Sequence, residues 1–201
     1  MAIQGNYHYR SLSPLGSPSR TLAVASGWSY GCCSLDAPAQ SFGPFANLVE
    51  TWQSRRLDGR TLPARRAFEM EDFRDWMGQI FIAKIERAPF DLRYTLWGTT
   101  LVDWWGVDYT GKTLGNQSES PESWNAERRY FETMSRAPFI GLAGGMLTQH
   151  SRDHVKVLGL DLPLGDGPRM DRVLSAHLRV NFDDDVGTII PDCPITPFED
   201  T

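Results

Sequence analysis

The chain has 201 residues, of which 41% are hydrophobic and 22% charged, and a formal net charge of −5; this length and composition suit one globular domain with tails. No apolar run approaches the roughly 20 residues that cross a bilayer, and three cysteines are too few for a disulfide framework. We therefore expect neither a helical membrane span nor a disulfide-stapled scaffold, and free thiols favour a cytoplasmic protein.

The charge is unevenly distributed along the chain. Residues 183–201 contain six acidic and no basic residues, so the rest of the protein is close to neutral. The opposite bias lies in SRRLDGRTLPARR (54–66), which has five arginines against one aspartate. A nucleic-acid binder spreads basic charge over a face and interleaves aromatic residues that stack on bases. This stretch lacks them, so we expect a solvated or partner-facing patch and no nucleic-acid or membrane partner.

Two segments predict little ordered structure. Residues 1–43 are rich in Ser, Gly and Pro without sustained hydrophobic periodicity, and residues 183–201 combine acidic residues with three prolines. Such segments bury too little apolar surface to offset the entropy lost on ordering. We expect a disordered or loosely attached N-terminal tail (1–43), a single domain (44–182) and a disordered acidic C-terminal tail (183–201).

The domain begins with a predicted amphipathic helix over 44–59. Its apolar residues follow the i, i+3, i+4, i+7 spacing of one helix face, and Gly59 suits its C-terminal end. These residues are Phe45, Leu48, Val49 and Trp52. The stripe is too apolar to face water, so we expect a homodimer or partner interface with Trp52 as its anchor. The alternative is a monomer in which the helix folds back on its own sheet.

The remaining elements predict an α+β domain. A short helix over 69–77 and a longer one over 120–136 accompany strands at 79–87, 91–97, 139–149, 153–164 and 172–182. Two antiparallel strands, a helical crossover and a three-stranded meander make one five-stranded antiparallel sheet with helices on one face. The residues expected to converge on the helix-covered face are Tyr94, Leu96, Trp124, Phe131, Leu174, Leu178 and Val180.

The stretch LRYTLWGTTLVDWWGVDYTGK (92–112) joins the second strand to the helical middle. Gly98 permits the sharp turn that ends the strand. In the short helix that follows, Trp104 and Trp105 offer large apolar area, and we expect at least one of them to cover the sheet face that carries Tyr94. Three glycines within the strand 139–149 indicate a bulge, or the close approach of a ligand or a helix to the sheet.

The order of these elements is that of a PAS domain, and three stretches resemble one bacterial family of stand-alone PAS-like proteins. WQSRRLDGRTLPARR (52–66) is similar to the family's opening, IFIAKIE (80–86) to its first strand, and the 92–112 stretch to its central signature. Met77-Gly78 departs from the family's Leu-Pro, and Lys84 from its frequent Asp. The resemblance implies a PAS-like fold with an N-terminal capping helix.

The resemblance also implies a non-catalytic sensory, signalling or adaptor domain that binds a small ligand, a protein partner or both. We place the candidate ligand-binding residues on the aromatic side chains of the second strand and the helical middle. They are Tyr94, Trp105, Trp124 and Phe131.

No cofactor chemistry is predicted. A flavin-binding PAS photosensor needs a reactive cysteine in its helical middle, and residues 99–136 contain none. His150 and His154 flank a predicted hairpin turn, where their i, i+4 spacing does not make a metal pair, and His177 lies on the polar face of its strand. We therefore expect surface histidines and no catalytic residues, metal, haem or flavin.

Two other functions stay open at this point. One is a small enzyme with a cone-like α+β fold of the ketosteroid-isomerase type, which would carry a buried Asp/Tyr or Asp/His pair. The other is a purely structural interaction module without a ligand. Two strands ahead of the main helix argue against the enzyme.

Overall fold

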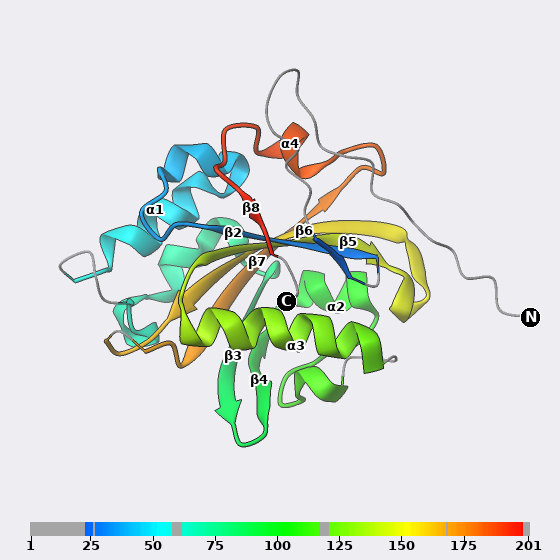
Figure 1. Cartoon of the computed structure of the whole chain (residues 1–201), viewed down its shortest axis with the longest axis horizontal. Helices are drawn as coiled ribbons and strands as arrows, with labels where there is room; N and C mark the ends of the chain where they lie inside the picture. Colours follow the sequence, from blue (N-terminus) through cyan, green and yellow to red (C-terminus); the bar gives the residue numbers. More distant parts are fainter. Residues whose placement is uncertain (1–22, 26, 58–61, 117–120, 168, 199–201) are drawn as a thin grey trace, which may run out of the picture.

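One antiparallel sheet organises the protein (Figure 1). The structure is a computed structural model that describes residues 23–25, 27–57, 62–116, 121–167 and 169–198. Within these ranges the strand order is β1-β2-β5-β6-β7-β3-β4, and β8 also pairs with β2. The strands are β1 (Ala23–Ala25), β2 (Trp28–Cys33), β3 (Ile80–Arg87), β4 (Phe90–Trp97), β5 (Ile140–Leu147), β6 (Arg152–Leu164), β7 (Arg172–Val180) and β8 (Thr196–Pro197).

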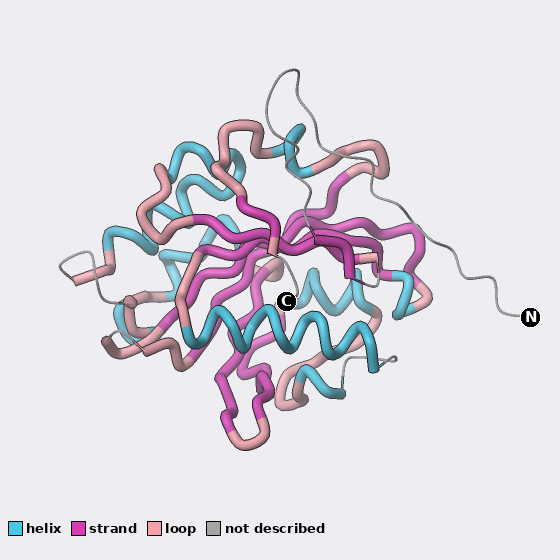
Figure 2. Tube along the Cα trace, in the orientation of Figure 1, coloured by secondary structure: helices cyan, strands magenta, loops and turns pink. Residues whose placement is uncertain are grey.

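Helices cover both faces of this sheet (Figure 2). On one side lie α1 (Ala46–Ser54) and α4 (Val186–Ile189), and on the other α2 (Thr99–Trp105) and α3 (Pro121–Arg136). The 3₁₀ segments are η1 (Ala39–Phe45), η2 (Arg65–Ala67), η3 (Met70–Trp76), η4 (Leu114–Asn116) and η5 (Thr148–His150). The predicted helices of one face are α2 and α3, and α1 is the predicted N-terminal capping helix; α4 on the second face was not predicted. β6 shows that both faces are covered, because residues 155–164 are all buried and the strand has no face left for solvent.

The five strands predicted from the sequence form the contiguous part β4-β3-β7-β6-β5 of the sheet. Each begins and ends within two residues of its predicted bounds. The α+β class and the antiparallel pairing are confirmed. The predicted count of five was wrong, because β1, β2 and β8 extend the sheet beyond β5.

The predicted core residues are divided between the two faces of the sheet. In register, Leu174 on β7 lies beside Ile82, whereas Tyr94 on β4 lies beside Ala83. Neighbouring positions on a strand point to opposite faces, so Leu174 and Tyr94 belong to different layers of the core. Both are buried, while Leu96, Leu178 and Val180 are partly buried against the core. Phe131 is buried, and the side chain of Trp124 lies outside what the structure describes.

One added strand comes from the segment predicted to be an N-terminal tail. β2 pairs with β5 over six residue pairs, and its Trp28 and Tyr30 lie beside Gly145 and Ala143. Small residues on β5 leave space for these large rings. One face of β2 is therefore buried, which could not be predicted from the residues of β2 alone. Residues 28–43 thus belong to the folded domain, while residues 1–22 and 26 lie outside the described ranges.

The acidic C-terminal segment is also folded where the structure describes it. Asp185 caps α4, because its Oδ1 accepts a hydrogen bond from the Thr188 amide at 2.7 Å. Further along, Cys193 is buried with its Sγ 3.2 Å from the Sγ of Cys33 on β2. Residues 183–198 therefore continue the fold rather than forming the predicted disordered tail.

The α1 helix packs against its own sheet. The four residues of its predicted apolar stripe are at most 2% exposed, and Trp52 Nε1 donates a hydrogen bond to the Pro163 carbonyl oxygen at 3.0 Å. This is the folded-back arrangement, in which Phe45, Leu48, Val49 and Trp52 offer no exposed surface to a partner. A homodimer or partner complex through this helix stays a prediction, and it would require the helix to leave the sheet.

We predict that Trp52→Ala destabilises the protein by about 3–5 kcal/mol, as expected for a large buried side chain. Urea unfolding followed by circular dichroism measures this change. Leu57→Ala is the control, because Leu57 is 77% exposed and its truncation should cost at most about 0.5 kcal/mol. A Trp52→Ala protein that keeps full stability but dissociates from a wild-type dimer in sedimentation would contradict the folded-back helix.

Candidate functional site

The sheet face that meets α3 carries glycines that allow the helix to approach closely. An alanine Cβ built at Gly141 on β5 would lie 1.8 Å from the Tyr130 hydroxyl and 2.6 Å from Met134 Cε, both on α3. At Gly145 on the same strand, a Cβ would lie 2.8 Å from the Trp28 ring. The sequence predicted that these glycines mark a bulge or the close approach of a ligand or a helix. At Gly141 the structure shows the close approach of a helix.

A β-bulge in the β3–β4 pair brings two aromatic side chains to this same face. Trp97 pairs with Phe81 and Tyr94 pairs with Ala83, and the register shifts between them. Thr95 falls at this shift and its hydroxyl donates to the Ile82 carbonyl oxygen at 3.0 Å. A bulge of one residue places side chains three positions apart on one face, so Tyr94 and Trp97 lie together, with ring centroids 5.0 Å apart.

Between this face and the helices α2 and α3 lies a cavity of about 30 Å³. Among the described residues its lining comprises Trp28, Tyr30, Phe81, Tyr94, Trp97, Trp105, Glu127, Phe131, Ala143, Asp161 and His177. Trp28 and Glu127 are partly exposed and the other nine are buried. Solvent therefore meets the cavity on the side where β2 and α3 come together.

Asp161 is a buried acid in the floor of this cavity. It is 2% exposed, and Tyr130 on α3 donates its hydroxyl proton to Asp161 Oδ2 at 2.9 Å. Burial raises the pKa of Asp161 to about 6, and the hydrogen bond from Tyr130 limits the rise. Gly141 lies beside Asp161 in register, so the missing side chain of Gly141 is what lets the Tyr130 hydroxyl reach the acid.

Glu127 is the second acid of the cavity, and it comes from α3. Although Glu127 as a whole is partly exposed, its carboxyl group is turned into the cavity. Loss of solvation there, together with the nearby charge of Asp161, raises the pKa of Glu127 to about 8. No described residue forms a hydrogen bond or ion pair with Glu127. At neutral pH the two acids therefore share about one proton, and no Lys or Arg lines the cavity among the described residues to balance the remaining charge.

His177 lies inside the cavity, so the prediction of a surface histidine was wrong for this residue. It is 5% exposed, and its ring centroid lies 5.5 Å from that of Phe81 and 5.3 Å from that of Trp105. Burial lowers the pKa of His177 to about 3, so the imidazole is neutral at pH 7. The polar face of β7 is buried because α2 lies over it and brings Trp105 onto the histidine. His177 Nδ1 has no hydrogen-bond partner among the described residues.

Three indole N–H groups around the cavity also lack partners. The Nε1 atoms of Trp28, Trp97 and Trp105 are buried, and no described residue accepts a hydrogen bond from them. Buried polar atoms in folded proteins are almost always hydrogen-bonded to protein or water. Together with His177 Nδ1, these donors make the cavity polar at several points within an aromatic wall.

A comparison with protein families agrees with this architecture. A family model described as a PAS domain matches residues 43–175, more than half of the chain. The chain belongs to this PAS-domain family. The resemblance predicted from the sequence is therefore confirmed. Comparisons with curated proteins and with solved structures gave no match.

The PAS domain brings together three of the four predicted ligand-binding residues. Tyr94, Trp105 and Phe131 all line the cavity, whereas the side chain of Trp124 lies outside the described residues. Trp105 covers the sheet face as expected, and Trp104 is partly buried beside it. Ligand binding by these side chains stays a prediction.

Sequence reasoning missed the polar residues of the cavity. Asp161 interrupts an otherwise apolar strand, and an acid at such a position is a recognisable signal of a buried polar site. His177 gave no such signal, since its alternating strand also suits a solvated face. Glu127 did give a signal, because it lies three residues after Trp124 and four before Phe131, on the apolar face of its helix.

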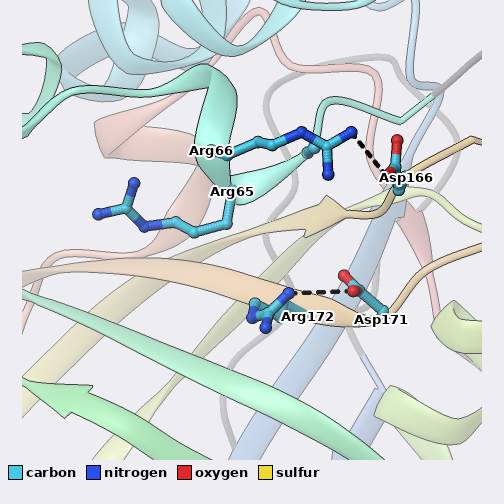
Figure 3. A pocket seen from close by; sticks show the side chains of 6 residues that line it. Arg65, Arg66, Asp166, Asp171 and Arg172 are labelled. Carbon is cyan, nitrogen blue, oxygen red and sulfur yellow. Dashed lines mark hydrogen bonds and ion pairs between the residues drawn. The ribbon is translucent and has the colours of Figure 1, made fainter.

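A second, open cleft lies at the other end of β7 (Figure 3). Its volume is about 370 Å³, and its lining is Ala64, Arg65, Arg66, Asp166, Asp171 and Arg172. Arg66 pairs with Asp166 at 2.7 Å and Arg172 with Asp171 at 3.0 Å, while Arg65 donates to the Phe68 carbonyl oxygen. Arg66 and Arg172 are thus each paired with an acid of the same cleft, in exposed or half-exposed ion pairs of little energetic weight. The interior cavity is the better candidate site.

The described ranges contain no cluster of three or more His, Cys, Asp or Glu side chains that could hold a metal ion. Within the same ranges no helix has the length and apolar character of a membrane span.

We predict that Gly141→Ala destabilises the PAS domain by about 1–3 kcal/mol, because the added methyl group must displace the Tyr130 hydroxyl from Asp161. Gly144→Ala on the same strand is the control, since its nearest neighbour would lie at 3.4 Å. An alanine there should be neutral or slightly stabilising, by up to about 0.5–1 kcal/mol. Equal effects of the two substitutions in urea unfolding would contradict the close approach of α3.

We also predict that stability falls as the pH rises from 6.5 to 8.5. The folded-state pKa of Glu127 is raised to about 8, so the folded protein holds a proton that the unfolded chain has already lost. The loss should be about 1–2 kcal/mol over this range. Over the lower part of this range His177 opposes the fall by about 0.4 kcal/mol, because it is neutral in the folded protein but about half protonated in the unfolded chain at pH 6.5.

Glu127→Gln should flatten this dependence when urea unfolding is measured at several pH values. Glu132→Gln is the control, because Glu132 lies on the same helix but pairs with Arg136. A Glu127→Gln protein that keeps the full wild-type slope would show that Glu127 is not the responsible group.

Proposed function

We propose that this PAS domain is a sensory module that binds a small molecule in the cavity between α2, α3 and the sheet. The observation that carries the proposal is the set of buried polar atoms without partners around one cavity, namely His177 Nδ1 and the indole nitrogens of Trp28, Trp97 and Trp105. Leaving such a group unpaired costs about 1–3 kcal/mol. A bound molecule that supplies the missing partners would recover that free energy, and binding energy is what a sensor uses to change state.

A change in the cavity would be transmitted through α3. Glu127 and Phe131 on this helix line the cavity, while Arg129 and Arg136 on the same helix are exposed. A ligand that draws Glu127 inward or displaces Phe131 therefore acts on a helix whose outer surface is available to a partner. This route needs no catalytic step and suits an adaptor or signalling domain.

The test is thermal unfolding of the full chain against a panel of small amines, carboxylates, amides and alcohols. At least one compound should raise the Tm of the wild type, by roughly 2–4 °C for each kcal/mol of binding. Ala143→Val fills the cavity and should abolish the response. Gly144→Ala should keep it, because Gly144 lies between two cavity-facing positions of β5 and itself faces the other layer. A response that survives Ala143→Val would place binding elsewhere, and no response at all would favour the purely structural module.

One observation favours a second function. The buried Asp161–Tyr130 pair, with Asp161 titrating near pH 6, is the kind of pair that a small proton-transferring enzyme of cone-like fold would use. Such an enzyme would convert the compound that it binds. Mass spectrometry of each stabilising compound after incubation with the protein distinguishes the two functions, because a sensor returns the compound unchanged.

A further inference from the structure

We propose that the ligand of this cavity is a small ammonium ion, either ammonium itself or methylammonium, held between the Glu127 and Asp161 carboxyl groups and the surrounding aromatic rings. This inference rests on the proposed function, since it names the class of molecule that the sensory cavity takes. Of the unpaired buried atoms, His177 Nδ1 can accept a hydrogen bond from an ammonium group, while the indole N–H groups are donors and take no part in its recognition.

The balance of charge in the cavity points to a cation. Glu127 and Asp161 both line it, no Lys or Arg does so among the described residues, and His177 is neutral at pH 7. A carboxylate taken out of water is costly unless a positive partner accompanies it. The Tyr130 hydroxyl partners only Asp161, so Glu127, which is protonated in the empty cavity near pH 7, has no partner once it ionises. An anion would add to the unbalanced charge, and a cation would remove it.

The walls of the cavity also suit a cation. Seven of its eleven lining residues carry Phe, Tyr or Trp rings. The face of an aromatic ring is electron-rich and attracts an ammonium group, most strongly when the contact excludes water. Tyr94 and Trp97 meet at 81° and Trp97 and Trp105 at 90°, so the rings enclose the space from several directions. Aromatic rings combined with a carboxylate form the usual arrangement for recognising organic ammonium ions.

The size of the cavity selects a small member of this class. Its volume is about 30 Å³, and a cavity needs roughly 10–15 Å³ of such volume to hold one water molecule, so a small ion fits. Ammonium is close to water in size, and methylammonium adds one carbon that the aromatic wall can cover. Tetramethylammonium is too large for the cavity and has no N–H group to donate to Asp161 or Glu127. A potassium ion has a suitable size but likewise cannot donate a hydrogen bond.

Binding of such an ion is linked to protons. A cation favours the ionised forms of Glu127 and Asp161, so it should release the proton that the two acids share near neutral pH. The groups that face these acids are His177, which is already neutral, and the phenols of Tyr30, Tyr94 and Tyr130, whose pKa values are raised by burial. None of them supplies a charge that could substitute for the cation. Affinity should therefore fall as the pH drops from 8 to 5.

The experiment is isothermal titration calorimetry of the full chain at pH 8 with methylammonium chloride and ammonium chloride. Potassium chloride and tetramethylammonium chloride at equal ionic strength are the ligand controls. The wild type should bind the first two salts and not the last two. Glu127→Gln should weaken methylammonium binding at least about tenfold, because it removes one partner of a buried charge pair. Glu132→Gln, on the same helix outside the cavity, should bind as the wild type does.

Stability separates lost binding from lost folding. Without ligand, Glu127→Gln should unfold at the same temperature as the wild type or higher, since the variant removes a buried acid. Equal binding of potassium or tetramethylammonium would overturn the ammonium inference, and so would unchanged methylammonium affinity in Glu127→Gln. A neutral or anionic compound that binds the wild type but not Ala143→Val would also overturn it, while leaving the sensory cavity in place. If neither the ammonium salts nor any compound of the thermal-unfolding panel binds the wild type, the proposed function fails as well.

Discussion

The hydrogen bond from Tyr130 to Asp161 is the interaction on which the site depends. It joins α3 to the middle of the sheet at 2.9 Å, and it forms only because Gly141 leaves the space between them empty. The bond fixes the height of α3 above β5 and β6, and with it the positions of Glu127 and Phe131. The cavity is the space left when a helix held at this height meets a sheet face whose large rings stand on β2, β3 and β4.

The polar groups of the cavity also show how the PAS domain divides its two layers. The layer under α1 is apolar and includes Leu160, Leu174 and Ala176, each fully buried. The layer under α2 and α3 contains Asp161, Ser175 and His177 on the adjacent positions of the same strands. One layer thus stabilises the fold by excluding water, and the other accepts the cost of burying groups that can titrate or bind.

The sequence was a good guide to local structure and a poor one to what covers each face. Alternation and turn residues located β3 to β7 within two residues, because these signals depend on neighbours along the chain. They could not show that β2 joins the sheet, since its burial depends on Gly145 and Ala143, more than a hundred residues away. His177 was misplaced for the same reason. Its strand alternates as a solvated strand does, and only α2, which is distant in sequence, covers the polar face and buries His177 in the cavity lining. The bulge at Thr95 likewise moved Leu96 off the face predicted for it.

The energetics of Glu127 agree with the proposed binding role of the cavity, because the acid contributes nothing to the stability of the fold. A glutamine or leucine at this position would remove the cost of burying a carboxyl group next to Asp161, and replacing buried charges by well-packed neutral residues is often neutral or stabilising. The fold therefore has no need of the acid. Tyr130 already satisfies Asp161, so Glu127 does not serve that residue either. If a partner of opposite charge enters, as proposed, the free energy that Glu127 costs in the empty protein is recovered, and the folded domain has two states of different energy. The proposed sensory function requires such a difference.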